Sequence, residues 1–149
     1  MRTSIVVGLS TILLAGFGVT AGPADATTPA LHFTRIQYDS PGKDTRTNAS
    51  RNAEYVTIHN SGRHTATLTH WTVRDAAGHR YAFGTFNLRS GASVRLHTGS
   101  GRNTSTSRYW GSGNYIWNNT GDTAYLKTPA GHTHDSCRWT HDSPGHINC

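Results

Sequence analysis

The sequence contains little acid, little lysine and little sulfur. Of its 149 residues, 8 are Asp or Glu, 2 are Cys and 1 is Met, and Glu54 is the only glutamate. Charged residues make up 15% of the chain, which argues against a coiled coil and against a highly charged disordered chain. The hydrophobic fraction of 34% argues against a polytopic membrane protein as well.

What the chain does contain is arginine and histidine. Lys43 and Lys127 are the only lysines among the 14 basic residues, the formal net charge is +6, and there are 10 histidines. Histidine is a frequent metal ligand and titrates near neutral pH. The composition therefore raises the questions of metal binding and of a surface that becomes more basic near pH 6.

The first 26 residues have the pattern of a secretory signal peptide. Arg2 precedes an uncharged apolar run at residues 5–19, and the tripeptide at residues 24–26 (ADA) fits a signal peptidase site, with residues 19–21 (VTA) as a second possible cut. A membrane anchor is the alternative, but about 15 apolar residues fall short of the roughly 20 that span a bilayer. We expect a secreted chain, with no transmembrane segment after cleavage.

Both cysteines lie near the C-terminus. In a secreted chain, Cys137 and Cys149 are expected to form one disulfide that tethers residues 140–149 as a tail. The competing interpretation is a metal site that combines the two cysteines with His141 and His146.

Short alternating segments divided by turns fill most of the remaining chain. Residues 27–30 are expected to be a disordered leader, and the apolar phase shift between Phe33 and Ile36 indicates a β-bulge. In the segment around Trp71, we expect Trp71 and Val73 to face the core and Thr72 to face water. The polar stretches 39–52 and 98–107 are predicted to be loops. Eight or nine strands are expected, at residues 31–38, 54–60, 67–74, 79–83, 93–97, 115–117, 123–127 and 132–139, with a possible strand near 109–110. Strands at this spacing predict an all-β fold, a two-sheet antiparallel β-sandwich over residues 31–139.

Several segments together resemble a known family. In order, the chain carries EYVTIHN at 54–60, LTHWTVRD at 68–75, GHRYAF at 78–83, LRSG at 88–91 and WNNTGDTAYL at 117–126. Their order and spacing resemble the lamin tail domain, especially its stand-alone secreted bacterial forms, in which the opening loop resembles DSPGKD at 39–44. The resemblance implies an immunoglobulin-like sandwich used as a binding or attachment module, found alone or attached to secreted nucleases and other hydrolases. It brings no catalytic motif.

The residues themselves also offer no assembled catalytic site. Glu54 opens a predicted strand, the aspartates fall mostly in turns, and no G-x-S-x-G nucleophile motif is present. We therefore expect no enzymatic activity and no cofactor.

Two metal sites are suggested by the spacing of potential ligands. His132 and His134, two apart on a predicted strand, would share one face and would bind a transition metal, with His141 and His146 as further ligands. Asp39 and Asp44 would hold Ca²⁺, although Lys43 between them opposes a cation.

The arginines suggest an anionic partner. Guanidinium groups bind phosphate, carboxylate and sulfate, and those beside aromatic rings also favour stacking. The candidate contact residues are Arg102, Arg108, Tyr109 and Trp110, together with Arg46 and Arg51 in the loop 39–52; Arg63, Arg80, Arg89 and Arg95 are further surface arginines.

The sequence thus predicts a secreted, non-catalytic, lamin-tail-like module that binds an unknown extracellular or cell-envelope partner. The alternative is a protein that binds nucleic acid or another polyanion through arginine-rich loops. Two further hypotheses are a metal-dependent hydrolase and a carbohydrate-binding module that uses exposed Trp110 or Trp117.

Overall fold

The computed structural model describes residues 28–140 and 144–149. The expected signal peptide at residues 1–26, Thr27 of the expected leader, and His141 lie outside the described residues. Thr28, Pro29 and Ala30 have no regular secondary structure.

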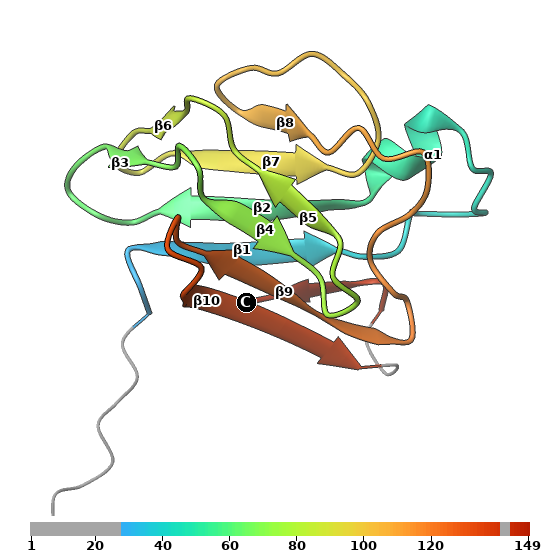
Figure 1. Cartoon of the computed structure of the whole chain (residues 1–149). Coiled ribbons are helices and arrows are strands. Elements are labelled where there is room, and N and C mark those ends of the chain that lie inside the picture. The colour runs from blue at the N-terminus through green and yellow to red at the C-terminus, as the bar shows by residue number, and fades with distance from the viewer. Residues whose placement is uncertain (1–27, 141–143) are drawn as a thin grey trace, which may run out of the picture.

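The described chain contains eleven strands and one short helix (Figure 1). The elements are β1 (Leu31–Gln37), α1 (Asn48–Ala53), β2 (Tyr55–Asn60), β3 (Ala66–Thr67), β4 (Thr72–Arg74), β5 (Arg80–Ala82), β6 (Asn87–Leu88), β7 (Ser93–His97), β8 (Ser107–Tyr109), β9 (Gly121–Lys127), β10 (Thr133–Thr140) and β11 (His146–Asn148).

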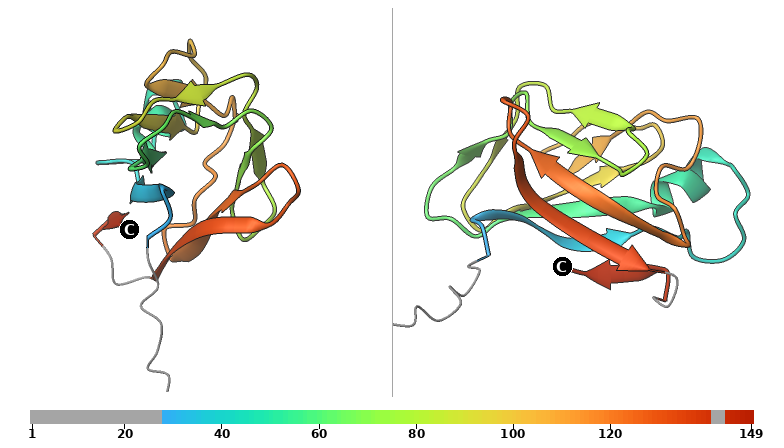
Figure 2. Two further views of the ribbon diagram at one scale, coloured as in Figure 1. Left: turned by 90° about the vertical axis from the view of Figure 1, so that its left-hand side faces the viewer. Right: turned by 60° about the horizontal axis from the view of Figure 1, so that its bottom comes forward.

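These strands form two main layers, which Figure 2 shows from two further sides. One layer is a five-stranded sheet in the order β11-β1-β2-β7-β8, and the other is a four-stranded sheet in the order β10-β9-β4-β5; β3 and β6 pair separately. All pairs are antiparallel except β7 with β8. The predicted all-β, immunoglobulin-like sandwich is confirmed.

The core lies between the two layers because apolar residues alternate along the strands. Val56 and Ile58 on β2 are fully buried, as the alternation predicted. The bulge on β1 is confirmed, with the register shift between Phe33 and Arg35. At that point the Asp135 carboxylate accepts the N–H of Phe33 at 2.7 Å, so a side chain of β10 satisfies a backbone donor of β1.

The helix α1 and the segment around Trp71 differ from the sequence-based expectations, and the expected strand 67–74 is divided into β3 and β4. The loop 39–52 ends in α1, which starts where the Thr47 hydroxyl accepts the N–H of Ser50; so short a helix shows no helical periodicity in the sequence. His70 has a φ of 65°, and this left-handed residue changes the side-chain phase just before β4. As a result Thr72 is buried and Trp71, expected as a core residue, is half-buried.

The predicted disulfide is present and joins the two sheets. Cys137 lies on β10 and Cys149 directly follows β11, with an S–S distance of 2.03 Å. The tail that was expected to be held only by this bond also forms β11, which pairs with β1 through Ile36 and Ile147. The bond therefore fastens an edge strand of one sheet to an edge strand of the other.

Replacing both cysteines with alanine should destabilise the fold. Closing a loop of this length stabilises a protein by about 3 kcal/mol on the chain-entropy estimate, so the double variant should have a free energy of unfolding lower by about that amount, measured by urea denaturation. Reductant should have the same effect on the wild-type protein and none on the variant. Equal stability of the variant and the oxidised wild type would contradict this role.

Candidate functional site

The outward side of the five-stranded sheet is lined by basic and aromatic residues. The strand register arranges these residues in three rows across the sheet: His32, His59 and Ser93; Arg35, Thr57, Arg95 and Ser107; and Gln37, Tyr55, His97 and Tyr109. We call this surface the basic face. The five strands β1, β2, β7, β8 and β11 contain no acidic side chain.

Neutral groups hold the side chains of this face in place. The His97 ring lies between Tyr55 and Tyr109, with centroid distances of 5.7 and 5.1 Å. The Arg95 guanidinium lies 4.8 Å from the centroid of the Tyr55 ring, and Arg35 donates to Gln37 Oε1 at 3.1 Å. The two arginines are therefore positioned while their charge stays uncompensated.

Most carboxylates in the described part of the chain accept hydrogen bonds from neutral amide groups and not from arginine or lysine. Asp135, Asp122 and Asp75 accept backbone N–H groups, and Asp39 accepts the side-chain amide of Asn119. The one ion pair among the described residues joins His79 to Asp75. No arginine or lysine in that part of the chain is thus paired with a carboxylate, and the excess positive charge is available at the surface.

The only glutamate has a structural position that its sequence context did not reveal. Glu54 is 0% exposed, and its carboxyl accepts the N–H groups of Trp117 at 2.7 Å and Ile116 at 3.2 Å. This explains why residues 115–117 are not the strand that was expected: two of their backbone donors bind a side chain.

Burial raises the pKa of the Glu54 carboxyl from 4.5 to about 7. The facing Thr98 hydroxyl and the N–H groups of Trp117 and Ile116 lower this pKa, and the nearby Asp44 raises it. The Thr98 hydroxyl faces the carboxyl without meeting the geometry of a full hydrogen bond. Desolvation dominates because it acts on the whole charge, whereas each donor offsets part of it.

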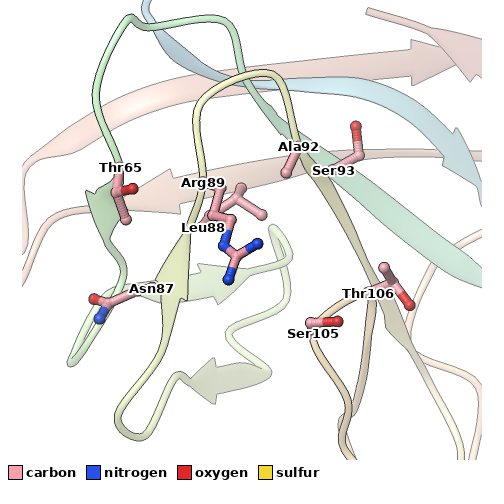
Figure 3. Close-up of a pocket in the computed structure, with 8 residues that line it drawn as sticks. All are labelled: Thr65, Asn87, Leu88, Arg89, Ala92, Ser93, Ser105 and Thr106. Carbon is pink, nitrogen blue, oxygen red and sulfur yellow. The ribbon is translucent and has the colours of Figure 1, made fainter.

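A polar pocket of about 560 Å³ borders β7. Figure 3 shows the Arg89 guanidinium at its centre, between Asn87 on one side and Ser105 on the other. Thr65, Thr106 and Ser93 add hydroxyl groups, and Ser93 also belongs to the basic face. The pocket therefore presents one cation and several hydrogen-bonding groups, which suit an oxyanion.

The sequence model of the Lamin Tail Domain family matches residues 24–141. The chain belongs to the lamin tail domain family. No curated protein sequence gives a significant match. The matched residues include the strands of this lamin tail domain from β1 to β10, whereas β11 lies beyond them.

Of the contact residues predicted beside the loop 98–107, Tyr109 is the one that lies in a row of the basic face. Arg108 turns to the other side of the sheet, where its guanidinium lies 3.9 Å from the centroid of the Phe86 ring. Trp110 is half-buried beside Tyr81 and Trp117, at 5.9 Å from each ring. Arg102 is exposed in the loop.

The other predicted aromatic and arginine contacts lie apart from the basic face. Trp117, expected as an exposed ring, is 4% exposed and belongs to the core. Arg46 is exposed, and its carbonyl accepts a hydrogen bond from Arg51 of α1. Arg35 was not among the predicted residues, yet it lies on the basic face, because its neighbours in the row come from distant strands.

The metal candidates are distributed over different parts of the lamin tail domain. His132 is exposed and precedes β10, while His134 is half-buried with its ring 4.9 Å from that of Trp71. A register shift between Thr133 and Asp135 disturbs the alternation that was expected to align the two imidazoles. Asp39 binds Asn119 and Asp44 is exposed. Within the described residues, no group of three or more His, Cys, Asp or Glu is arranged to hold a metal ion.

No helix in the described part of this lamin tail domain is long and apolar enough to cross a membrane.

The ionisation of Glu54 should make the stability of the domain depend on pH. The folded-state pKa, about 7, lies above the ordinary value of 4.5 that applies to the unfolded chain. The folded state therefore gains stability from the protonated Glu54 carboxyl. This contribution is present in full below pH 4.5 and is lost as the pH rises through about 7, which lowers the free energy of unfolding by about 3 kcal/mol. Urea denaturation at several pH values measures it.

Glu54→Gln should remove this part of the pH dependence, because an amide does not ionise in this range. Asp44→Asn, which changes an exposed carboxyl near Glu54, is the matched control and should keep the decrease. Parallel stability profiles for the wild type and Glu54→Gln would show that the buried carboxyl does not cause it.

Proposed function

We propose that this lamin tail domain is a secreted, non-catalytic module that binds an extracellular polyanion through its basic face. The observation that carries the proposal is the charge distribution on the five-stranded sheet. Its strands contain no acidic side chain, and Arg35 and Arg95 occupy one row of the outward face.

The geometry of that row suits a polymer better than a single small anion. Arg35 and Arg95 are separated by Thr57 on the strand between them, which places their backbones about 10 Å apart. Two anionic groups of one polymer molecule would therefore bind the two arginines at the same time. Ser107 continues the row of the two arginines, and Tyr55 and Tyr109 lie in the next row, so their hydroxyl groups would supply further hydrogen bonds to such a polymer.

Secretion is supported by the signal-peptide pattern and by the disulfide between Cys137 and Cys149, which suits an oxidising compartment. The absence of catalysis in this proposal is supported by the roles of the acids. Glu54 is enclosed by the backbone of Ile116 and Trp117, and Asp75 caps the turn that ends at His79. These carboxyls maintain the fold and do not face a common substrate site.

Removing the charge of the central row should weaken polyanion binding. The double variant Arg35→Gln/Arg95→Gln should bind heparin and DNA at least tenfold more weakly than the wild type in low salt. The slope of log affinity against log salt should become smaller by about 2, because each arginine that binds a phosphate contributes about 1 to that slope. Fluorescence anisotropy with labelled ligands at several salt concentrations measures both quantities.

The matched control is Arg74→Gln/Arg80→Gln. These two exposed arginines are cross-strand neighbours on the four-stranded sheet, so the variant removes the same charge from the other layer. It should keep most of the affinity. An equal decrease in both variants would mean that total charge, and not the basic face, determines binding; no retention of the wild type on either ligand would end the proposal.

Comparing the ligands distinguishes the source of the anionic groups. Preference for DNA over heparin at equal salt would favour a nucleic acid as partner, and the reverse would favour a sulfated or acidic polysaccharide.

A further inference from the structure

One end of the basic face carries a pair of histidines on neighbouring strands. His32 on β1 and His59 on β2 are directly opposite in the antiparallel register. Their ring centroids are 5.6 Å apart and the rings are inclined by 77°. Side chains at opposite positions leave the sheet on the same side, with Cβ atoms about 4.5–5.5 Å apart, so both imidazoles reach the same space above the sheet.

In each histidine, Nδ1 has a hydrogen-bond partner, which leaves Nε2 as the nitrogen that could bind a metal ion. His32 Nδ1 lies 2.8 Å from the carbonyl oxygen of Pro29. A carbonyl oxygen only accepts, so Nδ1 carries the hydrogen and Nε2 of the neutral ring keeps its lone pair. His59 Nδ1 lies 2.9 Å from the Ser93 hydroxyl, which accepts from Nδ1 in the tautomer that also leaves Nε2 free. Histidines that bind metals typically have such a hydrogen bond at the other nitrogen.

The distance between the rings also suits a shared ion. Two imidazoles that bind one ion at about 2.0–2.1 Å have ring centroids roughly 5 Å apart. The observed 5.6 Å is close to that value, and a small rotation of two partly exposed side chains closes the difference. Arg35 and Arg95 lie in the next row and are not between the two rings.

The donor set indicates which ions would bind. No acidic side chain lies on β1, β2 or β7, and hard cations such as Ca²⁺ need oxygen ligands. Imidazole nitrogen favours Cu²⁺, Ni²⁺ and Zn²⁺, with Cu²⁺ bound most tightly.

We propose that His32 and His59 form a surface site for a divalent transition-metal ion, Cu²⁺ above the others, with water completing the coordination shell. The site lies at one end of the basic face, in the row next to Arg35 and Arg95, and uses neither arginine. It also differs from the His132 and His134 pair that the sequence suggested.

The test is titration of the purified, untagged, disulfide-bonded protein with Cu²⁺ alone. Isothermal titration calorimetry should give one ion per chain, and electron paramagnetic resonance should show two coordinating nitrogens. His32→Gln and His59→Gln should each weaken binding at least tenfold, while His132→Gln, the matched control, should not change it. Cu²⁺ should also raise the melting temperature of the wild type but not of His32→Gln or His59→Gln, because only the folded state brings the two strands together.

A measurement on the wild type keeps the test valid if a variant folds poorly. Substoichiometric Cu²⁺ should broaden the NMR signals of the His32 and His59 rings before those of His132. Preferential broadening of His132, or wild-type affinity in folded His32→Gln and His59→Gln proteins, would overturn the proposal. Unchanged Cu²⁺ affinity in the Arg35→Gln/Arg95→Gln variant would show that the metal site and the polyanion site succeed or fail separately.

Discussion

The aromatic part of the core depends on the hydrogen bonds that the buried carboxyl of Glu54 accepts from the backbone. This carboxyl accepts the backbone N–H groups of Ile116 and Trp117 and so fixes a segment that forms no strand. The Trp117 ring then meets Trp139, which stacks on Tyr38 at 4.9 Å. A polar group deep in an apolar core lowers the stability of the fold unless its hydrogen bonds are satisfied. Here the bonds to Glu54 take the place of the backbone hydrogen bonds that a neighbouring strand would form with residues 116 and 117.

The same use of acids explains the surface charge. Asp135 accepts a backbone N–H group at the bulge of β1, and Asp75 and Asp122 accept backbone N–H groups of turns. Carboxylates used in this way do not pair with arginines, so the excess of positive charge remains unpaired on the described surface. Strand order, and not composition, places Arg35 and Arg95 in one row of a sheet whose strands carry no acidic side chain.

Much of the fold was predictable because its signals are local. Alternation of apolar residues predicted β2, and the phase shift after Phe33 predicted the bulge. The two cysteines, in a chain that begins with the pattern of a signal peptide, predicted their bond. Tyr109, a predicted contact residue, lies on the basic face, and its contact with a partner stays a prediction. The role of Glu54 and the phase at Trp71 were missed, since the first depends on a distant backbone segment and the second on the left-handed conformation of His70.

The sequence alone thus determined the family, the class of fold, the basic charge and the histidine content, all of which are properties of order along the chain. Tertiary structure alone decided which residues became neighbours. His32 meets His59, and Arg35 shares a row with Arg95, through antiparallel pairing across the sheet. Register is set by the burial of the opposite side of each strand, so the pattern of the core determined the composition of the face that is open to partners.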